Sequence, residues 1–240
     1  FDADAAIIDP LIGGYIGGTY EVKGNARGGP FRLEFGRGQE PTEWTQIGSE
    51  RGDDVSNGVL ENFDTTGLED GLYTLRLIVR RGDGERVWTT PITIDNTSPT
   101  VVISEPKPDR LYVREDDEQI NINVLPADEY GIGKVAFYID DSGIITSTVA
   151  PYNERWNIEM RDIAQIETGS TRNWLAFESD DPEIKPGREL PFDEGFSAIR
   201  TSEGLYLEGH KIKVVVFDLA GNEVESDEVQ VYVRRKPEDE

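Results

Sequence analysis

Oxygen-bearing side chains that suit a metal ion occur in three short, turn-like stretches of the sequence. In chain order they are Asp95 and Asn96, Asp128 and Glu129, and Asp218 and Asn222. Calcium takes six to eight oxygen ligands in flexible geometry, and carboxylates and amide carbonyls are the side chains that supply them. If folding brings the three stretches together, these residues predict a structural calcium site.

A second interpretation of the same residues needs no metal. Asp and Asn often accept hydrogen bonds from the backbone two residues further on and so close turns by themselves. The segment from Asp218 to Asn222 fits such a turn. The sequence leaves both interpretations open.

Nucleophilic chemistry is poorly supported. Ser104-Glu105-Pro106-Lys107 has the Ser-x-x-Lys spacing of penicillin-binding transpeptidases, but that motif must open a helix and be accompanied by Lys-Thr-Gly. Here it follows a strand-like run and precedes Pro108, and the sequence contains no Lys-Thr-Gly. A single histidine, His210, excludes a histidine-based zinc cluster. We predict a chain that is not an enzyme and that requires no cofactor.

Composition excludes further classes of function. The 48 acidic and 24 basic residues give a net charge of −24, which repels nucleic acids and anionic lipid surfaces. The sequence has no cysteine, and no apolar run is long enough to cross a membrane. Arg51-Gly52-Asp53 and Arg81-Gly82-Asp83 invite a receptor-binding interpretation, but ordinary turn chemistry is enough to explain them.

The elements that would position these residues read as strands. Apolar residues alternate with polar ones, at period two, between Gly, Pro, Asn and Asp clusters. The segments that show this most clearly are residues 31–35, 59–63, 72–80, 87–94, 120–124, 135–139 and 229–233. Helical periodicity is confined to residues 159–168, so the predicted class is all-β.

The number of strands and the length fit two tandem immunoglobulin-like or fibronectin III-like β-sandwiches, since one such domain takes roughly 100 residues. We place the first domain at residues 1–97 and the second at 98–240, with a long insertion at about 159–207 and a short charged tail. In this fold the three oxygen-rich stretches lie at one end of the second sandwich, which puts the predicted calcium at the domain junction. Tyr73 and His210 fall where the fold has its tyrosine corner, so we expect structural roles for both.

The insertion is either an extra hairpin or a surface for a ligand or partner. It contains Trp174 and Phe177, of which Trp174 is the tryptophan we expect to be exposed. Trp156 is expected in the core.

The chain also resembles a known region of cell-wall enzymes. The resemblance rests on Phe31-Arg32-Leu33-Glu34-Phe35-Gly36-Arg37-Gly38, Asp70-Gly71-Leu72-Tyr73, Gly133-Lys134-Val135-Ala136-Phe137-Tyr138 and Val216-Phe217-Asp218-Leu219-Ala220-Gly221-Asn222. These runs look like the C-terminal Ig-like tails of bifunctional penicillin-binding proteins, which join a glycosyltransferase to a transpeptidase. The resemblance implies an extracytoplasmic accessory region that spaces or docks a peptidoglycan synthase against the cell wall or a cell-envelope protein.

Two alternatives remain from the sequence. The chain could be a spacer segment of a surface adhesin or S-layer protein, or a carbohydrate-binding module of a secreted hydrolase. Because the sequence starts at Phe1, we expect a larger native polypeptide, and the strandless tail 234–240 suggests a nearby C-terminus.

Overall fold

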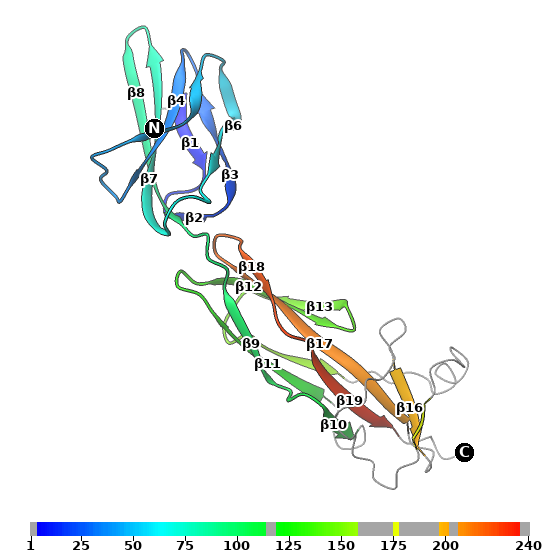
Figure 1. Ribbon diagram of the computed structural model, residues 1–240. Coiled ribbons are helices and arrows are strands. Elements are labelled where there is room, and N and C mark those ends of the chain that lie inside the picture. Colours follow the sequence, from blue (N-terminus) through cyan, green and yellow to red (C-terminus); the bar gives the residue numbers. More distant parts are fainter. Residues whose placement is uncertain (1–3, 114–118, 158–174, 178–196, 202–205, 236–240) are drawn as a thin grey trace. The chain divides into compact units, whose positions relative to one another are not determined.

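The computed structural model describes residues 4–113, 119–157, 175–177, 197–201 and 206–235. All regular elements in these ranges are strands (Figure 1). The chain divides into two compact units, each built as a β-sandwich. The first contains Phe1–Ser98 together with the short segments Glu129–Gly133 and Phe217–Asn222, and the second contains the remainder. The predicted all-β class with tandem sandwiches is confirmed.

The first unit has two sheets. One has the order β1 (Ala5–Asp9), β3 (Thr19–Ala26) and β6 (Val55–Asp64). The other has the order β2 (Gly14–Ile16), β8 (Gly84–Ile94), β7 (Gly71–Arg81), β4 (Phe31–Arg37) and β5 (Thr45–Arg51). Pairing is antiparallel except between β2 and β8, which run parallel.

The core of the first unit follows the alternation expected for residues 72–80. Tyr73, Leu75, Leu77 and Val79 of β7 are all buried and pack in one cluster with residues of both sheets. Each fully buried leucine contributes about 1.5–3 kcal/mol through removal of apolar surface from water. Thr74 points the other way but is also buried, and its hydroxyl donates to the carbonyls of residues 38 and 39, which offsets the cost of burying it.

A two-residue turn joins the longest strands of the first unit. Arg81 pairs with Gly84, so Gly82 and Asp83 form the turn, as the sequence predicted. Gly84 has a φ of +127°, a conformation that side-chain-bearing residues rarely adopt. The turn fixes the register of β7 on β8.

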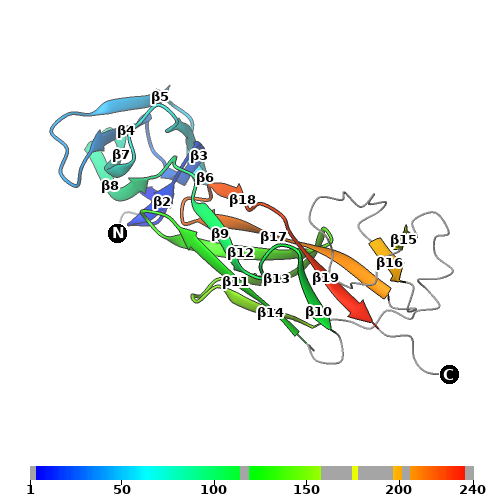
Figure 2. The same ribbon diagram turned by 60° about the horizontal axis from the view of Figure 1, so that its bottom comes forward.

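The second unit also has two sheets (Figure 2). The three-stranded sheet has the order β14 (Asn153–Asn157), β11 (Gln119–Ala127) and β9 (Thr100–Glu105). The larger sheet has the order β10 (Arg110–Val113), β19 (Val229–Arg235), β17 (Tyr206–Asp218), β12 (Ile132–Ile139) and β13 (Ser142–Ser147). Three short strands extend it: β18 (Glu223–Glu225) and β16 (Ser197–Thr201) pair with β17, and β15 (Leu175–Phe177) pairs with β16.

The core of the second unit lies between these sheets. The residues of β11, β12 and β19 that the period-two pattern predicted to face inward are all buried: Ile120, Ile122, Val124, Val135, Phe137, Ile139, Val229, Val231 and Val233. Ala136, expected on the outer face, is also buried, with an exposed fraction of 9%. A short side chain is easily covered by its larger neighbours.

The predicted insertion at 159–207 is described only in part. Residues 175–177 and 197–201 form β15 and β16. The helical pattern at 159–168 and Trp174 lie outside the described residues. No helix in the described part of the chain is long and apolar enough to span a membrane.

Candidate cation site

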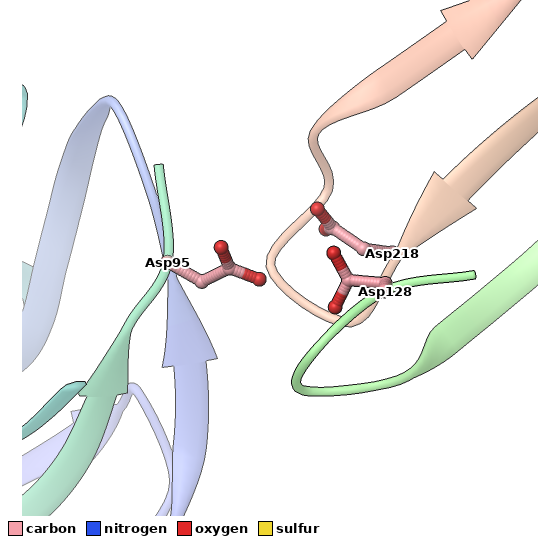
Figure 3. A group of neighbouring side chains, drawn as sticks. All are labelled: Asp95, Asp128 and Asp218. Atoms are coloured by element: carbon pink, nitrogen blue, oxygen red, sulfur yellow. The ribbon is translucent and has the colours of Figure 1, made fainter. Parts of the chain in front are cut away.

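Three of the six predicted calcium ligands come together. Carboxylate oxygens of Asp95, Asp128 and Asp218 lie within 4.8 Å of one another (Figure 3). Asp95 follows β8, Asp218 ends β17, and Asp128 immediately precedes the segment Glu129–Gly133 of the first unit. Asp95 and Asp218 are buried, with exposed fractions of 0% and 3%. Carboxylates that lie this close together and are shielded from water repel one another unless a positive charge or a proton offsets the repulsion.

Asp218 also serves the turn that follows it. Its Oδ1 accepts hydrogen bonds from the backbone N–H groups of Gly221 (2.7 Å) and Asn222 (2.9 Å). Its Oδ2 accepts from Asn222 Nδ2 at 2.8 Å. The turn predicted as the metal-free alternative is therefore formed, and it holds the Asp218 carboxylate in place.

Asn222 connects this turn to the segment after β8. Its Nδ2 also donates to the carbonyl of Asp95 at 2.9 Å. A Cβ at Gly17 would lie only 2.3 Å from that carbonyl oxygen and 3.2 Å from Asn222 Oδ1. Only glycine fits position 17, because any side chain would push these groups apart.

Asn96 and Glu129 do not join the three carboxylates. The Oδ1 of Asn96 accepts from Gly18 N–H and from the Thr65 hydroxyl, both at 2.9 Å, and its Nδ2 donates to the Thr65 carbonyl at 2.9 Å. Glu129 is exposed. Asn96 thus ties the segment after β8 to the loops of its own unit.

Asp70 and Thr65 were missed at the sequence level. Asp70 Oδ1 accepts from the backbone N–H of Asn96 at 2.8 Å, and its Oδ2 accepts from the Thr97 hydroxyl. The signal available was the turn composition of residues 64–71, which predicts a loop but not its partner. With Asp70, residues 95–97 are hydrogen-bonded at every position.

The Ser-x-x-Lys segment has no catalytic geometry. Ser104 lies on β9 and its hydroxyl donates to the carbonyl of Asn123 at 3.1 Å. Lys107 Nζ donates to the carbonyl of Ser104 at 2.7 Å, not to its hydroxyl. A base must lie within hydrogen-bond reach of the nucleophile, and here the ammonium is held by the backbone.

Both Arg-Gly-Asp tripeptides are tied into their own turns. Arg51 forms two hydrogen bonds with Asp53, of 3.1 and 2.6 Å, and its guanidinium lies 5.4 Å from the Phe31 ring centre. Asp53 has a lowered pKa because Arg51 donates these bonds. In the second tripeptide, Asp83 pairs with Arg86 at 2.7 Å.

The two predicted corner residues differ. Tyr73 donates its hydroxyl to the carbonyl of Glu69 at 3.0 Å, which is the expected tyrosine corner. The expectation of a corner at His210 is wrong, because Nδ1 of this buried ring lies 2.7 Å from Asp140 Oδ2, on the turn between β12 and β13. An imidazole is too short to copy the reach of a tyrosine, so it pairs with the neighbouring strand.

The three tryptophans in the described ranges have different neighbours. Trp88 packs on the core of the first unit, and the Trp44 ring lies 3.8 Å from the Arg76 guanidinium. Trp156, expected in the core, is partly buried and meets the His210 ring edge-on at a centroid distance of 4.8 Å. Phe177, the other aromatic residue expected to bind, lies in β15.

Comparison with family models matched one part of the chain. Residues 99–172 match the model of the bacterial Ig domain. Domains of this kind are typical of extracellular or surface proteins, where they act as structural or adhesion-type modules, and they are generally non-catalytic. A comparison with proteins of curated function gave no match.

Solved structures give distant similarities. The fibronectin(III)-like modules of Clostridium thermocellum CbhA are 19% identical, over 97% of this chain and 94% of that chain, with a TM-score of 0.48. The FN1–FN3 domains of chicken CNTN1 are 13% identical, over 97% of this chain and 65% of that chain, with a TM-score of 0.44. The BSP domain of a biofilm-associated protein is 14% identical, over 91% and 28%, with a TM-score of 0.24.

Proposed function

We propose that this chain is a non-catalytic spacer region of a bacterial extracytoplasmic protein. The observation that carries the proposal is the hydrogen bonding of residues 95–97, the segment that leads from β8 toward β9. The backbone of Asn96 and the hydroxyl of Thr97 donate to Asp70, and the Asn96 amide is fixed by Gly18 and Thr65. A segment held at each residue has little conformational freedom, which is what a spacer requires.

If the chain is a spacer with such a segment, we expect slow amide hydrogen exchange across residues 95–97 in the intact chain. Asn96→Ala is expected to speed exchange there, while the strands keep their protection. Fast exchange at residues 95–97 in the unaltered protein would contradict an ordered segment.

We further propose that calcium binds at Asp95, Asp128 and Asp218. The close approach of the three carboxylates supports this, since a divalent cation would offset their repulsion and backbone carbonyls or water could complete its shell. The ion would be structural. Asp128 is the best residue to test, because Asp218 is also needed for its own turn.

Thermal unfolding at about 5 mM calcium and in EDTA tests this site, since extracellular calcium modules bind at roughly 0.1–1 mM. We expect a higher midpoint with calcium, a smaller increase in Asp128→Asn, and an unchanged increase in the control Asp83→Asn. An identical midpoint in calcium and EDTA would exclude the ion.

The narrower form of the proposal is that the spacer belongs to a peptidoglycan synthase and docks it against the cell wall or an envelope protein. Only the resemblance of the quoted sequence runs to penicillin-binding protein tails supports it. An antibody against this chain can recover the native polypeptide for labelling with a fluorescent penicillin. A labelled polypeptide much larger than 26.8 kDa is expected. A large unlabelled one would favour a surface adhesin.

A further inference from the structure

One face of the three-stranded sheet in the second unit carries an unusual set of side chains. Strands β14 and β11 lie side by side there, with β9 on the other side of β11 (Figure 2). Three cross-strand pairs occupy the face opposite the core, and together they contain five amides and one arginine. These pairs, here called the amide face, are Gln119 with Asn157, Asn121 with Arg155, and Asn123 with Asn153.

The alternation along β11 fixes which way these residues point. Ile120, Ile122 and Val124 are buried, so the residues between them face away from the core. Gln119, Asn121, Asn153, Arg155 and Asn157 are exposed, and Asn123 is partly exposed. Glu154 pairs with Ile122 and therefore shares the opposite face.

Folding alone does not explain this composition. Asn is depleted in strands, where threonine, valine and aromatic residues are preferred. Four asparagines on one face of two neighbouring strands conflict with local propensity, and such conflicts are expected at functional sites. The amide face is thus a candidate for binding.

The charge of the amide face restricts the class of ligand that it can bind. Its six residues include one positive charge and no acidic group, whereas the whole chain has a net charge of −24. Glu105 lies opposite Asn123 on β9, but Lys107 and Arg110 pair with it at 3.8 and 3.7 Å. The negative charge of the chain as a whole repels polyanions, and the six residues of the amide face include no carboxylate that would attract a cation. A neutral partner is favoured.

Amide side chains match a hydroxyl-rich partner. Each carries two N–H donors and one carbonyl acceptor, and a hydroxyl both donates and accepts. Gln119 Nε2 donates to Asn157 Oδ1 at 2.8 Å, which orients the two amides of this pair relative to each other. Next to the amide face, Leu125 and its partner Val102 are 63% and 60% exposed. These two side chains offer apolar contact beside the amide face.

We propose that the amide face binds a neutral polysaccharide. The amides and Arg155 hydrogen-bond sugar hydroxyls, and Leu125 and Val102 contact the C–H faces of the rings. This site differs from the Trp174 surface expected of a carbohydrate-binding module. It does not depend on calcium or on the spacer role.

The test is binding of the whole chain to an array of neutral and acidic glycans, in EDTA. The variant Asn121→Thr/Asn123→Thr is suitable because threonine is favoured in strands and should keep the fold. Gln46→Thr, an exposed amide on β5 of the first unit, is the matched control. We expect binding to neutral glycans that falls at least about tenfold in the double variant and is unchanged in the control.

Three results would overturn the proposal. One is absence of binding to any neutral glycan by folded protein. Another is binding that survives Asn121→Thr/Asn123→Thr when circular dichroism shows an intact fold. The third is concentration-dependent dimerisation in analytical ultracentrifugation that the double variant abolishes, which would assign the face to a second copy of this chain.

Discussion

Asp140 joins the turn between β12 and β13 to strand β17 through His210, whose Nδ1 lies 2.7 Å from Asp140 Oδ2. The other carboxylate oxygen of Asp140 accepts from the backbone N–H of Lys211 at 2.9 Å. Asp140 has a φ of +49°, a conformation that Asp and Asn tolerate better than other side-chain-bearing residues. One carboxylate thus holds both the turn and the only histidine.

Asp140→Asn tests the contribution of this pair. The substitution keeps a residue that accepts positive φ but places an N–H group opposite Nδ1 of a buried ring. We expect the free energy of unfolding to fall by about 1–3 kcal/mol, the cost of a buried polar group without its proper partner. Urea denaturation measures this. Asp141→Asn, at the adjacent positive-φ residue, removes only an exposed ion pair with Lys213 and should change stability by less than about 1 kcal/mol. Equal effects of the two substitutions would contradict the assignment.

Glu34 lies between Arg32 and Arg76 on the outer face of the first unit. Burial opposes its ionisation, but the hydrogen bonds from Arg32 and Arg76 outweigh this and lower the pKa of Glu34. A lowered pKa stabilises the fold above the unfolded value of about 4.3, and the contribution is lost as the pH falls through the folded value.

Glu34→Gln is therefore expected to destabilise the first unit by about 1–3 kcal/mol at neutral pH and by progressively less below about pH 4. Denaturation curves at a series of pH values check both points. Glu85→Gln removes an exposed partner of Arg80 at 3.3 Å and serves as the control, with an expected change below about 1 kcal/mol. A difference between Glu34→Gln and the unaltered protein that does not vary with pH would count against the assignment.

The phenol of Tyr20 should lose its proton at an unusually high pH. Burial of the ring, followed by the hydrogen bond to Asp9 and the charge of Asp9, raises the pKa of Tyr20 to about 12. Because the folded pKa exceeds the unfolded value of about 10, the stability it contributes is complete below about pH 10 and is lost as the pH rises toward the folded value. The difference between ultraviolet titrations of the unaltered protein and Tyr20→Phe isolates this phenol. A difference centred near pH 10 would contradict the prediction.

Asn96→Ala should weaken the first unit. The substitution removes three hydrogen bonds, to Gly18 N–H and to the hydroxyl and carbonyl of Thr65. We expect a loss of about 1–3 kcal/mol, because partly buried groups lose their partners. Asn62→Ala, an exposed asparagine on β6, provides the matched comparison in thermal or urea unfolding. Equal stability of the two variants would show that the Asn96 network contributes little.

The strands could be read from the sequence because their alternation is strict where one face is buried. Residues 72–80 and 120–124 show this pattern, and the structure extends them by a few residues to Gly71–Arg81 and Gln119–Ala127. Strands with little contrast between a buried and an exposed face were not predicted. One of them is β13, where five of six residues are exposed. An exposed edge strand has no buried face to impose a pattern.

The candidate site was predictable in part for a related reason. Fold geometry was enough to bring Asp95, Asp128 and Asp218 together, since all three lie at strand ends. It could not show that Asn96 turns toward Thr65, because the choice between two hydrogen-bond partners depends on distances of a few ångströms. The pairing of His210 with Asp140 joins residues 70 positions apart and left no local signal.

The parallel pairing of β2 with β8 has a consequence for how the chain is made. Ile16 lies opposite Ile94. At one edge of the larger sheet of the first unit, residues 14–16 therefore pair with residues 92–94, which are synthesised much later. Contacts between residues so distant in sequence form slowly and only when both are available. As the chain leaves the ribosome, β2 has no strand to pair with until Ile94 has emerged. This edge of the larger sheet therefore cannot form while the residues between β2 and the end of β8 are being synthesised.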